Sequence, residues 1–146
     1  MKNSKTTDEQ IKKSGMKDIQ LNTRFQALLS LTIITPLGFL CKFYRGPGFI
    51  WFNDYGGGIF YELFWCFAFF LIWPRKSATL RICGGVFIGT TILEFLQLFS
   101  HPTLDYIRSG FIGRTLIGSS FSLLDIPHYL IGCVLALGWL RAISRE

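Results

Sequence analysis

Four long apolar runs constrain this chain more than any other feature of its sequence. Each is close to the roughly 20 apolar residues that an α-helix needs to cross the hydrocarbon core of a bilayer. Half of the 146 residues are hydrophobic and 16% are aromatic, and the hydrophobic residues come in blocks, which is unusual for a soluble domain of this size. We therefore predict an all-α integral membrane protein. The four predicted transmembrane helices lie at about 25–41, 56–73, 80–99 and 126–142.

The segments outside these runs complete the predicted domain organisation. Residues 1–24 are polar and rich in lysine, and we expect at most a short surface helix there; residues 25–146 form a single membrane domain. Pro36 predicts a kink in the first span, and Gly46-Pro47-Gly48 predicts a turn after it. The connector 100–125 is too polar for a fifth span and too apolar for a free loop, which indicates an interfacial or re-entrant segment between helices 3 and 4.

The basic residues predict the orientation. Six of the fifteen Lys and Arg residues lie in the first 24 positions. If the N-terminus is inside, eleven basic residues fall on the cytoplasmic side and four on the outer side. This predicts a multi-pass protein of the bacterial inner (cytoplasmic) membrane with both termini in the cytoplasm. The net charge of +6 then reflects contact with anionic lipid, and we expect no nucleic-acid partner.

Ionisable side chains within apolar runs are costly in a bilayer and therefore mark a candidate site. In the predicted orientation these side chains all lie toward the outer leaflet, at the ends of the second, third and fourth spans and in the connector between the last two. Their convergence predicts a ligand-binding pocket open to the periplasm. Its expected residues are Glu62, Glu94, Gln97, Arg108, Arg114, Asp125 and His128.

Structural roles are open for the same residues. Asp125 precedes Ile126-Pro127 as a helix N-cap would. Glu62 and Glu94 could pair with the two connector arginines, and Gln97 could join helices by a hydrogen bond. The glycines of the third run, Gly84, Gly85 and Gly89, are expected to be packing residues.

No metal site or cofactor is expected. Cys41, Cys66, Cys83 and Cys133 are isolated along the chain, one in or beside each apolar run, and we interpret them as small residues of the membrane core. A metal held by Glu94, Asp125 and His128 would lack the local spacing that metal sites show.

The polar pattern resembles that of VanZ-like bacterial membrane proteins. The resemblance rests on Glu94-x-x-Gln97, a downstream arginine, Asp125 at the start of the last helix and Gly132 within it. The spacing is closer to a small uncharacterised family associated with that group, and this resemblance extends over residues 38–141. It rests on Asn53-Asp54-Tyr55-Gly56, Arg108, Gly113, Gly118, Phe121, Asp125, Tyr129 and Gly132.

The resemblance implies a function at the cell envelope, since VanZ-like proteins are linked to resistance to a lipid-tailed glycopeptide. Tyr129 stands where those proteins tend to carry asparagine, so the resistance function does not transfer directly.

Three function classes remain open. The first is binding of an envelope lipid or lipid-like (glycopeptide-type) compound, with Arg108 and Arg114 contacting its phosphate or carboxylate. The second is a non-catalytic accessory subunit of a larger membrane protein complex. The third is an enzyme acting on a lipid-linked envelope group, with Glu94 or Asp125 as a general base. The expected partners are therefore membrane lipids or membrane proteins.

Overall fold

A computed structural model describes residues 2–99, 102–110, 113 and 121–144 of the protein. These residues form helices joined by turns, with no strand among them. The helices are α1 (Lys2–Phe43), α2 (Phe49–Trp51), η1 (Phe52–Gly56), α3 (Gly57–Ile72), η2 (Lys76–Ala78), α4 (Thr79–Leu96), α5 (Pro102–Ser109) and α7 (Asp125–Ile143).

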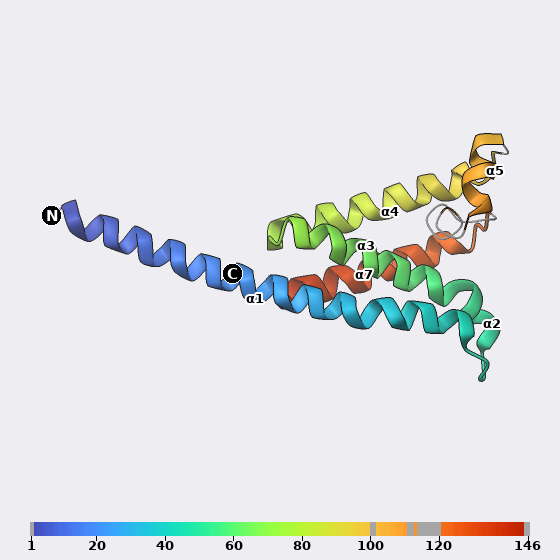
Figure 1. The fold of residues 1–146 in the computed structure, drawn as a ribbon, viewed down its shortest axis with the longest axis horizontal. Helices are drawn as coiled ribbons and strands as arrows, with labels where there is room; N and C mark the ends of the chain where they lie inside the picture. The colour runs from blue at the N-terminus through green and yellow to red at the C-terminus, as the bar shows by residue number, and fades with distance from the viewer. Residues whose placement is uncertain (1, 100–101, 111–112, 114–120, 145–146) are drawn as a thin grey trace.

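Four segments are long and apolar enough to cross a bilayer, which confirms the predicted all-α membrane architecture. They are Ser14–Phe43, Phe49–Ile72, Lys76–Leu96 and Asp125–Ile143. Successive long helices run in opposite directions. The connection between α3 and α4 therefore lies on the side of the bundle toward which both chain termini are directed (Figure 1). We call this side the terminal end. The opposite side, where α2 and α5 lie, is called the connector end.

The first helix is longer than expected. Helix α1 begins at Lys2 and runs without interruption to Phe43, so most of the polar segment 1–24 is helical. Figure 1 shows its N-terminal part projecting beyond the other helices. Residues 2–24 contain one glycine and no proline, and lysine, glutamine and glutamate are good helix formers. The helix also continues on both sides of Pro36.

Turn residues end the spans where the sequence predicts. Gly48 has a φ of +74°, a conformation that favours glycine, and the Phe49 N–H donates to the Gly46 carbonyl at 3.1 Å. Pro74 follows the end of α3. The predicted re-entrant form of the connector falls largely on residues outside those described, although the connector does contain α5.

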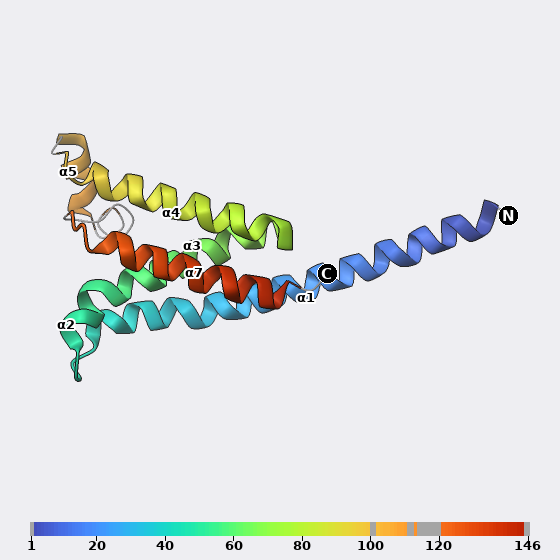
Figure 2. The same cartoon turned by 180° about the vertical axis from the view of Figure 1, so that it is seen from behind.

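Helix α3 is central in the bundle. It packs against α1, α7 and α4, and α7 packs against both α3 and α4 (Figure 2). Phe67 and Phe70 of α3 are fully buried, with Leu140 of α7 and Ile34 of α1 against the same core. Large apolar side chains also cover the outward faces of the long helices. This is the pattern of a bundle surrounded by lipid, in which helices associate by close packing rather than by exclusion from water.

Candidate functional site

Glu94 is the centre of a hydrogen-bond network at the connector end. Its side chain is 1% exposed. The backbone N–H of Ser122 donates to Oε1 at 2.7 Å, and Gln97 Nε2 and the Tyr129 hydroxyl donate to Oε2 at 3.0 and 2.9 Å. The network therefore joins α4 to α7 and to the segment before α7. It also brings Gln97 beside Glu94, and leaves Gln97 Oε1 buried without a hydrogen-bond partner among the described residues.

Asp125 lies beside this network. Ser122 connects the two acidic residues through its backbone, because its N–H donates to Glu94 Oε1 and its carbonyl accepts from the Asp125 N–H. Asp125 is the first residue of α7 and Leu124 occupies the N-cap position, so the structure does not place Asp125 at the N-cap that the sequence suggested. The physical reason is that the chain turns before Asp125, whose own N–H donates to the Ser122 carbonyl at 3.0 Å. In the first turn its carboxylate still favours the positive end of the helix dipole.

His128 faces away from the Glu94 network. Its ring stacks on Tyr55 of η1, with 4.4 Å between centroids and 10° between planes, and Trp51 lies 5.6 Å away. Nδ1 lies 2.6 Å from the Leu124 carbonyl oxygen. His128 therefore holds the start of α7 against η1 through aromatic contact.

Glu62 lies deeper in the bundle than Glu94. It is fully buried, and its Oε2 accepts a hydrogen bond from Cys133 Sγ at 3.0 Å. Cys133 is one helical turn farther from the connector end than Tyr129, which bonds Glu94, so Glu62 contacts α7 one turn farther from the connector end than Glu94 does. The structure thus groups Glu94 with Gln97 and Asp125 and does not place Glu62 in their network.

The connector arginines fall on parts of the chain about which little is described. Arg114 lies outside the described residues, and Arg108 is placed in α5 without a described side chain. Their pairing with Glu62 and Glu94 stays a prediction. The described hydrogen bonds to Glu94 already come from three neutral donors.

A groove of about 920 Å³ lies between α3 and α4. Tyr61, Trp65, Phe69 and Trp73 form its α3 wall, and their four-residue spacing places them on one face of the helix. The α4 wall includes Ile82, Gly85, Val86, Gly89, Thr90 and Leu93. The terminal end of the groove includes Arg75, Ser77, Ala78 and Arg81.

The α4 glycines keep this groove open. A Cβ atom added at Gly84, Gly85 or Gly89 would meet no other atom within 4 Å. They are therefore not packing residues against the described part of the chain, contrary to the expectation from sequence. Sequence reasoning also missed the Tyr129 hydroxyl and the Ser122 backbone as ligands of Glu94. The aromatic spacing on α3 was a usable signal for the groove, whereas a backbone donor such as Ser122 leaves no signal in sequence.

Comparison with known proteins identifies a family but no activity. The family described as "Protein of unknown function (DUF2809)" matches residues 49–133, which is more than half of the chain. The matched region contains Glu62, Glu94 and Asp125, while no VanZ-like family is among the matches. No curated protein and no solved structure matches the chain. This multi-pass membrane protein therefore belongs to the DUF2809 family, whose function is unknown.

Proposed function

We propose that the protein binds a lipid or lipid-like compound with an anionic head group in the groove between α3 and α4. The single observation that carries this proposal is the combination of an aromatic wall, an open glycine face and two arginines at one end. From Trp73 to Tyr61 the wall extends over twelve residues, or about 18 Å along the helix axis. One leaflet of the hydrocarbon core is about 15 Å thick, so the groove is long enough for an acyl chain.

Arg75 and Arg81 give the groove a charged end. Both are exposed, and both lie at the terminal end, where the spans of α3 and α4 reach the membrane surface. A guanidinium group binds two oxygens of a phosphate or carboxylate at once. The tail of an anionic amphiphile thus matches the apolar part of the groove, and its head group matches the charged end. In the orientation predicted from sequence, this head group lies in the cytoplasmic leaflet.

The connector-end site is a weaker candidate for the ligand. The Glu94 carboxylate is engaged by three donors of the protein itself, which favours a structural role and leaves it poorly placed as a general base. If the connector arginines bind a ligand there, that binding should not depend on substitutions in the groove. The proposed experiment separates these sites.

Native mass spectrometry of the protein extracted from membranes in mild detergent tests the proposal. Gly85→Leu should fill the groove without disturbing the fold, because nothing lies within 4 Å of the new Cβ. Gly138→Leu is the matched control, since Gly138 is an exposed glycine of α7 with equally open surroundings and lies outside the groove. We expect a lipid-sized adduct on the wild type and the control, and at least tenfold less on Gly85→Leu.

A second pair of variants tests the head-group contact. The double variant Arg75→Gln/Arg81→Gln should retain less of an anionic lipid than the wild type. Arg45 is an exposed arginine at the opposite end of the bundle, and Arg45→Gln should retain the lipid as the wild type does. Equal lipid retention by all variants would contradict a groove site. A different result would be a foreign polypeptide that binds the wild type stoichiometrically and is lost from Gly85→Leu. The groove would then be a protein interface, which favours the accessory-subunit function.

A further inference from the structure

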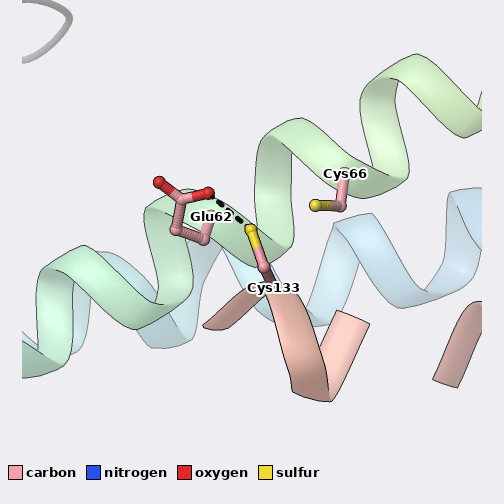
Figure 3. A group of neighbouring side chains, drawn as sticks. All are labelled: Glu62, Cys66 and Cys133. Carbon is pink, nitrogen blue, oxygen red and sulfur yellow. Dashed lines mark hydrogen bonds between the residues drawn. The ribbon is translucent and has the colours of Figure 1, made fainter. Parts of the chain in front are cut away.

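Three cysteines that are far apart in the sequence meet in the bundle core beside Glu62. Glu62 and Cys66 lie one turn apart on α3, and Cys133 faces them from α7. A carboxylate oxygen of Glu62 and the sulfurs of Cys66 and Cys133 all lie within 4.8 Å of one another, and all three residues are buried. Figure 3 shows the Glu62 carboxylate directed at the Cys133 sulfur. The Cys66 thiol, on the next turn of α3, points toward the same sulfur.

A fourth donor comes from α4. The Cys66 thiol interacts with the thiol of Cys83, and Cys133 Sγ lies 3.4 Å from the Cys83 carbonyl oxygen. Cys83 is buried as well. The cluster thus stands where three helices meet, and its side chains supply three sulfurs and one carboxylate.

The hydrogen bonds of the described residues leave one carboxylate oxygen of the cluster without a donor. The single Cys133 thiol proton faces both Glu62 Oε2 and the Cys83 carbonyl. Among the residues that the structure describes, none forms a hydrogen bond with Glu62 Oε1, although Glu62 is fully buried. Thr90 is a neighbouring hydroxyl, but its own proton is shared between the carbonyls of Val86 and Phe87. Buried polar atoms without partners are costly, and a bound cation would satisfy them.

We propose that Glu62, Cys66 and Cys133, with Cys83 as the fourth donor, bind one thiophilic metal ion. Sulfur ligands select Zn²⁺ and Cu⁺ over hard cations. Sulfurs at 2.3 Å around a tetrahedral ion lie about 3.8 Å from one another. The separations among the Glu62 oxygen and the sulfurs of Cys66 and Cys133 therefore need to close by no more than about 1 Å, and the 3.0 Å contact between Cys133 and Glu62 is already short enough.

Proton release keeps this site electrically balanced. Thiols ligate metals as thiolates, so binding releases protons to water. The charge of the site does not change on loading when Cys66 and Cys133 bind Zn²⁺ as thiolates and Cys83 keeps its proton, because two protons leave as two positive charges arrive. Cu⁺ is balanced in the same way by the loss of one thiol proton. This matters because net charge is expensive between membrane helices. The site lies in the interface of α3 with α7, and its occupation does not depend on a lipid in the α3–α4 groove.

Metal content of the purified protein is the direct test. The full chain in mild detergent is reduced under argon, exposed to Zn²⁺ or Cu⁺ in separate samples, freed of loose metal by gel filtration and analysed by elemental mass spectrometry. We expect about one ion per chain on the wild type and on Cys41→Ser, whose buried cysteine lies on α1 outside the cluster. Cys66→Ser and Cys133→Ser should retain at least tenfold less at the same free metal concentration.

X-ray absorption of the metal-loaded wild type provides a measurement that needs no variant. It should count at least two sulfur ligands, and Glu62→Gln should lower affinity without reducing the sulfur count. Retention of Zn²⁺ but not Cu⁺, or the reverse, identifies the ion and supports the site. A reduced, monodisperse wild type that retains neither ion would overturn the proposal, as would equal metal content in Cys41→Ser and the two cluster variants.

Discussion

Replacing Gly132 by alanine tests how closely α7 approaches α3. A Cβ atom at this position would lie 2.7 Å from Glu62 Cβ, 2.8 Å from the Ile59 carbonyl oxygen and 3.2 Å from Ile59 Cα. Two of these three atoms belong to the backbone of α3 and cannot rotate away. Alanine therefore requires the two helices to separate by several tenths of an ångström, which loosens contacts along the whole interface.

The control is Gly138→Ala on the same helix, where the new Cβ meets nothing within 4 Å. Alanine favours a helix over glycine by up to about 1 kcal/mol at either position, so the difference between the variants isolates the steric term. Overpacking costs about 1–3 kcal/mol, and the backbone contacts favour the upper part of that range. We expect Gly132→Ala to be less stable than Gly138→Ala by about 2–3 kcal/mol, or roughly 30- to 150-fold in the unfolding equilibrium.

Reversible unfolding of both variants in mixed detergent micelles, followed by circular dichroism, measures this difference. The wild type provides the reference, and monodispersity of each variant excludes aggregation as a cause. Stabilities that agree within about 0.5 kcal/mol would show that α7 does not lie this close to α3. The contact between Cys133 and Glu62 would then lose its geometric basis as well.

Three further predictions test the network, the core and the orientation. Tyr129→Phe removes one of the three hydrogen-bond donors to the buried Glu94 carboxylate, and should lower the free energy of unfolding by about 1–3 kcal/mol in the same assay. An unchanged free energy of unfolding would show that this hydroxyl does not bond Glu94. Phe67→Ala should cost about 3–5 kcal/mol because the ring is fully buried, whereas Phe69→Ala, whose ring is 42% exposed at the groove, should cost less than about 1 kcal/mol. In intact cells an impermeant maleimide should label Arg45→Cys but not Ser77→Cys, since the distribution of basic residues predicts that the terminal end lies in the cytoplasm; the opposite labelling pattern would refute this predicted orientation.

The spans were predictable because each depends on one local property. Length and hydropathy place the helices within a few residues for the third and fourth spans, as the end of the third at Leu96 shows. Pro74 and the glycines around Pro47 mark the turns through their own backbone preferences. The same reasoning underestimated α1, because the polarity of residues 1–24 led us to expect at most a short surface helix there, although polarity argues against membrane insertion and not against a long helix.

Side-chain partners between helices were not predictable in the same way. Helical periodicity shows which residues share a face, but the partner of that face depends on how each helix is rotated in the bundle. Glu62 was grouped with Glu94 from its expected depth, and its observed partner is Cys133. Gly132 sets this pairing, because the close approach it permits brings Cys133 onto the Glu62 side of α3. The cysteines meet for the same reason, although 16 residues or more separate them in sequence.

The two faces of α4 explain why a groove can persist beside a tightly held core. Toward α7 the helix presents Cys83 and Glu94, which are buried, and the Glu94 network fixes its connector end. Toward the membrane, Gly85 and Gly89 leave an open surface. A hollow of this size would be costly inside a soluble protein, because its lining atoms would lose their contacts. In a bilayer, lipid tails can restore those contacts, so an open glycine face opposite an aromatic wall costs less there than in water. The architecture of α4 itself therefore favours a lipid-like occupant over an empty or water-filled groove.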